Sequence, residues 1–531
     1  MDGLTGARRV WTIVGRRAGC SGTEMVMALL LGIDIGTSSV KAILFDSEAG
    51  EVKAVAQQEY PIHKPAPDRA EQDPDDWWKA SVAVVRRVIA QSGQRDVSAI
   101  GLCGQMHGTI MLDAKDQPIH PAIVWPDQRS AAECVELVRV FGARRYASIA
   151  GTLPATGFMA PTLLWLRHHD PALLDRVHRV MLPKDYVRLK LTAIIASDPS
   201  DAAATGLFDI SAKKWSSTII NGMGLPGGIF PALRESQAVA GELTEAAAGI
   251  LGLNRGIPVV CGCADQPAQT LGSGMVSPGK AAVSIASGGT VVTPLRPENA
   301  AQIPTDPRLH VFNHAAPGMW YVLGAILSAG LSLRWLRGVM DMDDLGNVAY
   351  ERFSAAAETV APGAEGLIFL PYLTGERTPH MDAQARGGFI GLTAYHEQGH
   401  LARAVMEGVA FALRQALEIS VELAGTVGTV IAAGGGTESA VWRQILADVL
   451  GLPLQKSLLS DPAPIGAALL AGIGTGIYRD FEEAEAVTAR YGLATEPVAG
   501  RRALYDALYE EFKALYPRLR DDFHTLGDLT K

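Results

Sequence analysis

The sequence of 531 residues contains few cysteines and few aromatic residues, which are 6% of the chain. Its cysteines are odd in number and scattered, which is typical of a reduced protein and argues against a disulfide scaffold. They are Cys20, Cys103, Cys134, Cys261 and Cys263. Cys261-x-Cys263 lacks the CxxC spacing, and no second cysteine pair completes a zinc site. We therefore expect a reduced, cytoplasmic protein.

Long apolar runs and an excess of positive charge are also missing. The longest apolar candidate, 25–35, is interrupted by Asp34 and is shorter than the ~18 residues of a transmembrane helix. Residues 1–26 carry four arginines without an apolar core, so we expect an N-terminal extension rather than a secretory signal. The net charge of −9 disfavours nucleic acid as a partner. The sequence predicts neither a membrane nor a nucleic-acid partner.

The composition is that of a large globular protein. Hydrophobic residues make up 48% of the chain and charged residues 19%, which suffices for a sizeable core. The length suits two lobes. We place the first lobe at 27–270 and the second at 271–531, because no linker is visible and the boundary falls just after Asp265.

The two halves open in a similar way. An apolar strand at 28–35 and another at 281–285 each lead through small residues into a second strand. Asp34 and Ser284 hold matching positions 250 residues apart. This pattern indicates a duplicated α/β fold, although the similarity is weak.

Further elements follow from periodicity and capping. We expect helices from Asp73-Pro74, over 400–424, over 438–450 and over 501–516, and strands at 99–102, 257–261 and 429–433.

Two motif matches are decoys. His396-Glu397-Gln398-Gly399-His400 has the HExxH spacing of zinc proteases, but Gly399 weakens a helix there and no third ligand can fold back. Residues 274–281 nearly match a P-loop, yet Ala281 lacks the hydroxyl for Mg²⁺ and Pro278 removes a backbone N–H. We expect a loop in the first case and a surface turn before a strand in the second.

The remaining candidate residues and turns are those that phosphate transfer without a P-loop would need. Such an enzyme needs turns that face phosphates, a carboxylate for Mg²⁺ and a carboxylate base beside the acceptor hydroxyl. Asp34 ends a strand beside the turn Gly36-Thr37-Ser38, and Ser287-Gly288-Gly289 and Gly434-Gly435-Gly436 are further turns. Asp265 is expected where a buried strand ends in a loop, and burial there would raise its pKa. Each feature alone is more often a plain turn or cap, so only their joint occurrence favours this chemistry.

These residues resemble the FGGY carbohydrate kinase family from about residue 30 to about 478. One family signature is met by Gly387-x-Phe389-x-Gly391-Leu392 with His400-Leu401, Ala404 and Glu407. The other is met by 158–166, which departs at Thr162, where a lysine is usual. Within the family the chain is most similar to the xylulose kinases. The stretches that carry this similarity are Gln105-Met106-His107-Gly108, Leu182-Pro183-Lys184-Asp185-Tyr186, Ser197-Asp198 with Ser200-Asp201-Ala202-Ala203, and 370–380.

The resemblance implies roles for individual residues. Asp265 is implied as the catalytic base, and Asp34 as a second catalytic carboxylate that holds Mg²⁺ through water. The implied sugar contacts are Met106, His107, Trp125, Asp127, Asp265 and Gln266. The implied ATP contacts are Gly36, Thr37, Ser38, Ser287, Gly288, Gly289, Gly434, Gly435 and Gly436. On the residues alone, His107 could be a loop histidine, and Trp125 and Asp127 could be packing and turn residues.

The resemblance also implies a fold and a reaction. The fold would be α/β, with two actin-like (ribonuclease H-like) lobes around a central cleft, and a homodimer is a family-level expectation. With ATP and Mg²⁺, the enzyme would phosphorylate the small sugar D-xylulose at its 5-hydroxyl. Two alternatives stay open: an FGGY kinase for another ketose or polyol (ribulose, xylitol or glycerol), and an actin- or chaperone-like ATP switch.

Overall fold

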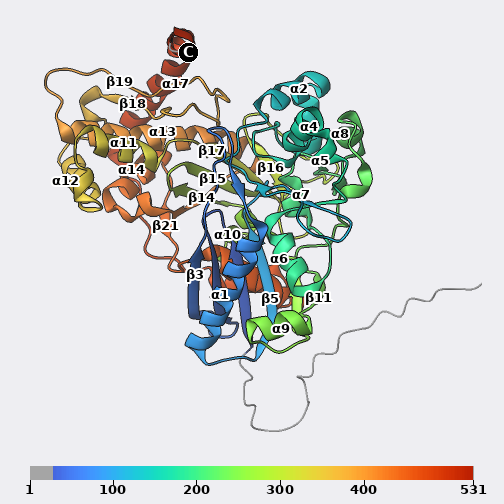
Figure 1. Ribbon diagram of the computed structural model, residues 1–531. Coiled ribbons are helices and arrows are strands. Elements are labelled where there is room, and N and C mark those ends of the chain that lie inside the picture. Colours follow the sequence, from blue (N-terminus) through green and yellow to red (C-terminus); the bar gives the residue numbers. More distant parts are fainter. Residues whose placement is uncertain (1–27, 530–531) are drawn as a thin grey trace, which may run out of the picture.

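The computed structural model describes residues 28–529, so the predicted extension at 1–26 lies outside the described residues. Two mixed sheets organise the chain (Figure 1). The first has the order β11-β12-β5-β1-β2-β3, with β13 beside β5. Its strands are β1 (Leu29–Ile35), β2 (Ser39–Asp46), β3 (Glu51–Glu59), β5 (Val97–Gly104), β11 (Val239–Glu242), β12 (Pro258–Val260) and β13 (Cys263–Ala264).

The second sheet has the order β16-β17-β15-β14-β20-β21. Its strands are β14 (Lys280–Ile285), β15 (Gly289–Leu295), β16 (His310–Asn313), β17 (Trp320–Ile326), β20 (Thr429–Ala433) and β21 (Leu454–Lys456). Each sheet contains an antiparallel hairpin, β1–β2 or β14–β15, whose first strand pairs in parallel with a later strand, β5 or β20. The pairs Ile35–Val40 and Ile285–Gly289 close the two hairpins at matching positions. The duplicated α/β fold is thus confirmed.

Helices cover both faces of the first sheet. On one face lie α1 (Pro74–Ser92), α6 (Pro183–Thr192) and α9 (Glu245–Leu251), and on the other α10 (Asp265–Gly272), α15 (Pro462–Gly474) and α16 (Phe481–Thr488). The predicted start of α1 is confirmed, because the Asp73 side chain accepts a hydrogen bond from the N–H of Asp75 at 2.9 Å. Although α15 follows the second sheet in sequence, it packs on β1 and β5 of the first. The chain thus returns to the first sheet after the second, and a single lobe boundary near 270 stays a prediction.

The second sheet is covered on its core face by α11 (Gly330–Val339), α12 (Val348–Glu358), α13 (Gln398–Ala424), α14 (Ala440–Leu450) and α17 (Arg502–Leu529). The expectation that the last helix ends at 516 is wrong, since α17 continues through Pro517. Asp382 explains the continuation, because it accepts hydrogen bonds from Tyr516 before the proline and lies 2.7 Å from His524 Nε2 after it. A short antiparallel pair, β18 (Ile368–Leu370) and β19 (Gly388–Ile390), lies beside α13.

A third body is inserted between β5 and β11, and Figure 1 shows it in teal and green beside β16. It contains β6 (Ile110–Leu112), β7 (Ala122–Ile123), α2 (Ala131–Phe141), α3 (Ala143–Ala150), α4 (Met159–His169), α5 (Pro171–Leu174), β8 (Arg179–Met181), α7 (Pro199–Ala203), β9 (Phe208–Asp209), β10 (Lys214–Trp215) and α8 (Ser217–Gly222). The body is bonded to the second sheet, because Val311 N donates to the Gly151 carbonyl oxygen at 2.7 Å and Asn313 Nδ2 to that of Ile210 at 3.1 Å. The sugar-contact loop predicted at 105–108 lies at this junction.

Candidate active site

Asp34 and Asp265 lie at the same edge of the first sheet. The strand registers place Asp34 opposite Cys103 on β5, and Cys103 opposite Cys263 on β13. Asp265 follows directly after β13. Because parallel strands end at one edge of a sheet, two carboxylates that are distant in sequence are brought together.

The loop expected at Asp265 is wrong, because this residue begins helix α10. The helix forms here because Ala268 and Leu271 give it an apolar face that packs in the same buried cluster as α15. A carboxylate in the first turn of a helix also interacts favourably with the N-terminal end of the helix dipole. The start of α10 thus fixes the direction in which the Asp265 side chain leaves the sheet.

Both carboxyl groups have raised pKa values. Burial raises the pKa of Asp265 to about 7, the negative charge of Asp34 adds to the rise, and the N–H of Gln266 opposes it. Burial likewise raises the pKa of Asp34 to about 6, although the Cys103 thiol donates to it at 3.4 Å. Within residues 28–529, Asp265 Oδ1 has no hydrogen-bond partner. A carboxylate with a near-neutral pKa and a free oxygen can accept a proton from a hydroxyl group.

The first hairpin turn is held by side chains from other segments. Trp125 Nε1 donates to Thr37 Oγ1 at 2.8 Å, and Gln72 Nε2 donates to the Thr37 carbonyl oxygen at 2.8 Å. The carbonyl oxygen of Gly36 accepts a hydrogen bond from the Tyr60 hydroxyl. The N–H groups of Thr37 and Ser38 have no hydrogen-bond partner in the described part of the chain. Fixed backbone N–H groups of this kind suit a phosphate group.

The other two predicted turns lie on neighbouring strands of the second sheet. Ser287-Gly288-Gly289 joins β14 to β15, and Gly434-Gly435-Gly436 follows β20, which pairs with β14. A cavity of about 850 Å³ opens beside Ser287, Gly435 and Gly436. This volume is in the range of small-molecule sites. Sequence reasoning missed its far wall, because α11 and α12 carry no motif; that wall includes Arg334, Asn347, Tyr350, Glu351, Ser354 and Glu358.

His107 presents one free ring nitrogen. Its ring stacks on Phe158 with centroids 3.8 Å apart, and Nδ1 lies 2.6 Å from the carbonyl oxygen of Ala204. Because a carbonyl oxygen can only accept, Nδ1 carries the proton and Nε2 is left as an acceptor. Burial lowers the pKa of His107 to about 3, so the ring is neutral near pH 7. Nε2 can therefore accept a hydrogen bond from a hydroxyl group.

Met106 connects this loop to the second sheet. Its side chain is buried, and its sulfur lies 3.8 Å from the Tyr321 hydroxyl on β17. Buried apolar residues of both halves, including Phe158 and Phe312, form one cluster with Met106. The predicted sugar pair therefore lies where both lobes contribute.

Trp125 and Asp127 are in different surroundings. Trp125 is 41% exposed and bonds to Thr37, as described above. Asp127 is fully buried, and its oxygens accept hydrogen bonds from Ala70 N at 2.7 Å and from Arg129 Nε at 2.9 Å. The Asp127 carboxylate thus stabilises its own loop, and its sugar contact stays a prediction without a free oxygen to support it.

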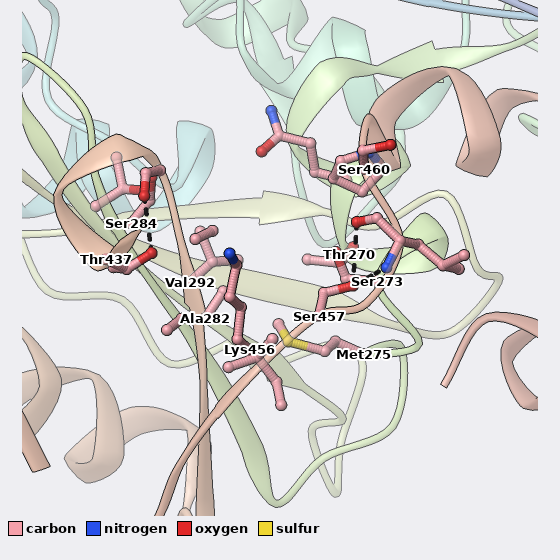
Figure 2. Close-up of a pocket in the computed structure, with 18 of the residues that line it drawn as sticks. Thr270, Ser273, Met275, Ala282, Ser284, Val292, Thr437, Lys456, Ser457 and Ser460 are labelled. Atoms are coloured by element: carbon pink, nitrogen blue, oxygen red, sulfur yellow. Dashed lines mark hydrogen bonds between the residues drawn. The ribbon is translucent and has the colours of Figure 1, made fainter. Parts of the chain in front are cut away.

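Gln266 lines a second cavity of about 400 Å³, shown in Figure 2. The cavity lies between α10, the inner face of the second sheet and the segment 456–462. Figure 2 shows side chains from all three, among them Thr270, Ser273, Ala282, Ser284, Thr437, Lys456 and Ser457. The cavity extends from Gln266, the residue after Asp265, to Gly434, so it lies between a helix of the first lobe and the second sheet.

Magnesium has one suitable ligand here rather than a complete cage. Among the described residues, no group of three or more His, Cys, Asp or Glu side chains is arranged to hold a metal ion. Mg²⁺ commonly takes one or two carboxylates, with water and substrate phosphates as further ligands. The carboxyl of Asp34 fits such a partial site, and the free N–H groups of the neighbouring turn suit the phosphate that would complete it.

The two decoys have structural roles. The loop expected at 396–400 is wrong for 398–400, which form the first turn of α13. Glu397 is the N-cap of this helix, and its side chain and that of His400 form reciprocal hydrogen bonds with the backbone. Residues 277–279 form the predicted surface turn before β14, whereas 274–276 are buried, and Lys280 Nζ donates to the Gly274 carbonyl oxygen at 2.9 Å. The HExxH segment lines neither cavity, whereas Met275 of the second segment lines the cavity shown in Figure 2. Over 28–529 we also find no helix with the length and apolar character of a membrane span.

Comparison with known proteins places the chain in a class of enzymes. The model of the N-terminal domain of the FGGY family of carbohydrate kinases matches residues 29–272, and that of the C-terminal domain matches 284–475. The chain therefore belongs to the FGGY family, with the two-lobed actin-like fold of that family. It is an ATP-dependent sugar kinase.

Several relatives of the chain within this family are xylulose kinases. The chain is 38% identical to a xylulose kinase from Escherichia coli (strain K12) over 500 residues, covering 92% of this chain and 99% of that protein. It is 34% identical to a xylulose kinase from Bacillus subtilis (strain 168), covering 93% and 98%. The crystal structure of a xylulose kinase from Rhodospirillum rubrum matches with a TM-score of 0.86 and 30% identity, covering 93% and 100%. A gluconokinase from Bacillus subtilis is 29% identical, covering 85% and 89%.

Proposed function

We propose that the enzyme transfers the γ-phosphoryl group of ATP to the 5-hydroxyl of D-xylulose, with Asp265 as the general base. The observation that carries the base assignment is a carboxyl with a pKa of about 7 and a free oxygen, next to Asp34 at one edge of the first sheet. The xylulose kinases among its relatives support the substrate.

In the proposed reaction Asp265 accepts the proton of the sugar hydroxyl as that oxygen bonds to the γ-phosphorus. The bond from phosphorus to the bridging oxygen of ATP breaks, and ADP leaves. The Thr37 and Ser38 N–H groups and the Ser287 turn would hold the phosphates, and the cavity beside Gly435 and Gly436 would take the nucleoside. Positioning and charge stabilisation supply most of the acceleration in such transfers.

Magnesium would be held by Asp34 through water and by the phosphates of ATP. When bound, it would neutralise charge that develops on the phosphate oxygens. A bound divalent cation would also favour the ionised form of Asp34 and so oppose the rise in its pKa. The cytoplasmic location and the homodimer remain predictions.

His107 would orient the sugar. Its neutral ring offers Nε2 as an acceptor for a sugar hydroxyl, while Phe158 and Ala204 fix the ring. Gln266 would extend the polar wall beside Asp265. These contacts select hydroxyl-bearing ligands in general, so the choice among ketoses and polyols must be measured.

A sugar acid is a second candidate substrate, favoured by Arg377. The guanidinium of this residue has no hydrogen bond or ion pair to any described residue. Burial is the main cause of the lowered pKa of His107 and His310, and the positive charge of Arg377 lowers both further. The guanidinium of Arg377 therefore lies toward the sugar-contact loop. An unpaired guanidinium suits a carboxylate group, and a gluconokinase is among the relatives.

The deciding experiment is a coupled ADP-release assay with D-xylulose, ribulose, xylitol, glycerol and gluconate, with and without Mg²⁺. We expect the highest kcat/KM with D-xylulose, and loss of turnover without Mg²⁺. A preference for gluconate that disappears in Arg377→Met would establish the second candidate. A preference for any of the others would overturn the proposed substrate while leaving the kinase class intact.

A further inference from the structure

Two sequence motifs that the proposed reaction does not use meet in one buried cluster. Lys184 and Arg188 come from α6, and Asp198 and Asp201 from the start of α7. Lys184 Nζ lies 2.7 Å from Asp185 Oδ1, 2.9 Å from Asp198 Oδ1 and 3.2 Å from Asp201 Oδ2. All of these side chains have zero exposed surface.

Burying these ionisable side chains together carries a desolvation cost that an apolar core of the same size would not have. Two cations face three aspartate side chains, and Arg188 Nη1 lies 2.7 Å from Asp185 Oδ1. Burial raises the pKa of Asp201 well above its ordinary value, whereas the cations hold that of Asp185 below it. Burial alone would lower the pKa of Lys184, but the carboxylates together hold it well above its usual range. The ammonium group therefore stays charged and fixes the positions of the carboxylates around it.

The cluster also holds the segment that leads to Asp265. At one end of that segment, Arg188 Nη1 donates to the carbonyl oxygen of Cys261 at 2.7 Å. At the other end, Ala264 N donates to Ser200 Oγ at 3.1 Å, and this hydroxyl donates to Asp198 Oδ2 at 2.5 Å. Ala264 directly precedes Asp265. A chain of contacts thus runs from Lys184 to the backbone before Asp265, first through the ion pair with Asp198 and then through the two hydrogen bonds of the Ser200 hydroxyl.

We infer that Ser200 is a positioning residue, which transmits the fixed geometry of the Lys184 cluster to Asp265. Small errors in the placement of a reacting group are expensive, since a shift of about 1 Å can cost on the order of 100-fold in rate. The inference rests on the proposed role of Asp265 as the base. It does not depend on which sugar is the substrate.

A matched pair of variants tests this inference. Ser236 Oγ donates to the same oxygen of Asp198, at 2.7 Å, but its hydroxyl has no hydrogen bond to 261–264 in the described chain. Ser200→Ala and Ser236→Ala each remove one donor to Asp198, and only Ser200→Ala also removes the acceptor for Ala264. We expect kcat to fall about 10- to 100-fold in Ser200→Ala, with KM for both substrates nearly unchanged. Ser236→Ala should keep kcat within about twofold.

The assay uses whichever sugar of the panel the unmodified enzyme phosphorylates fastest, so an incorrect substrate proposal does not affect the comparison. Crystal structures of both variants give a readout without turnover, and we expect a displaced Asp265 carboxyl only in Ser200→Ala. If Ser200→Ala does not fold, Ser200→Cys, with a weaker acceptor, should show a smaller loss of kcat in the same direction. Unchanged kcat in the folded Ser200 variant, or an equal loss in Ser236→Ala, would overturn the inference.

Discussion

Asp265 is the residue on which the chemistry depends, and its raised pKa has a consequence for stability. The pKa is about 7 in the folded protein against an ordinary value of 3.8. As the pH rises, Asp265 therefore loses its proton in the unfolded chain before it does so in the folded protein. The free energy of unfolding of the wild type falls as a result between about pH 4 and pH 7. Asp265→Asn cannot ionise and should be the more stable protein at pH 8, by a few kcal/mol at about 1.4 kcal/mol per pKa unit.

Urea unfolding of both proteins at pH 4, 6 and 8 measures this difference. We expect it to be near zero at pH 4 and to grow toward pH 8. A stability difference that does not change with pH would mean that Asp265 ionises normally in the folded protein.

His107 provides a second prediction for a single side chain. His107→Phe keeps an aromatic ring to stack on Phe158 but removes Nε2 as an acceptor. The KM for the sugar should rise about 10- to 100-fold, as expected for a lost substrate hydrogen bond, while the KM for ATP stays the same. Initial rates with each substrate varied in turn measure both constants. Equal changes in the two KM values would argue against a sugar contact.

The sequence predicted which side chains come together better than it predicted the hydrogen bonds that each of them forms. Asp34 and Asp265 could be placed at strand ends, because apolar runs end at both positions. The hydrogen bond from Ala70 N to the Asp127 carboxylate could not be foreseen, since it comes from a loop 57 residues away in sequence. The position of Arg377 near His107 and His310 likewise could not be predicted, because it depends on the tertiary structure.

Among the helices and strands, the contact of α15 with the first sheet is unusually close. A Cβ atom added to Gly101 of β5 would lie 1.8 Å from the carbonyl oxygen of Ala467, and one on Gly32 of β1 would lie 1.9 Å from that of Pro464. Only glycine leaves space for helix backbone to lie directly on the strands at these points. Because α15 also packs on α10, this contact supports the helix that begins with Asp265.

Gly101→Ala should therefore destabilise the protein by about 3 kcal/mol or more, the range of severe overpacking. Gly249→Ala in α9 is the control, because a Cβ there meets nothing within 4 Å. We expect the control to be neutral or stabilising by up to about 1 kcal/mol. Chemical denaturation measures both, and equal stability of Gly101→Ala and the wild type would show that α15 can move away from the sheet at no cost.

Element boundaries were predictable where the cause is local and not where it is tertiary. The Asp73 cap of α1 involves neighbours in sequence, and it is present as expected. The continuation of α17 through Pro517 depends on Asp382, far away in the chain, which bonds on both sides of the proline. The start of α10 at Asp265 similarly depends on packing against α15, which no local signal reveals.

For the molecule as a whole, the arrangement of the cleft predicts a closing motion. The cavity shown in Figure 2 separates α10 from the second sheet, and the chain crosses between the two sheets near it, at 456–462. Binding of sugar and nucleotide on opposite sides should draw the lobes together and exclude water. Small-angle X-ray scattering should show a smaller radius of gyration with D-xylulose and a non-hydrolysable ATP analogue together than with either alone. An unchanged radius would contradict closure.

The central claim is that Asp265 removes the proton from the sugar hydroxyl, and single-turnover rates of Asp265→Asn with saturating D-xylulose and Mg²⁺·ATP test it most directly. The substitution keeps the shape of the side chain and removes the base. The account predicts a fall of about 10²- to 10⁴-fold in the rate of phosphoryl transfer, with ATP binding retained. A rate within a few-fold of the wild type would contradict it.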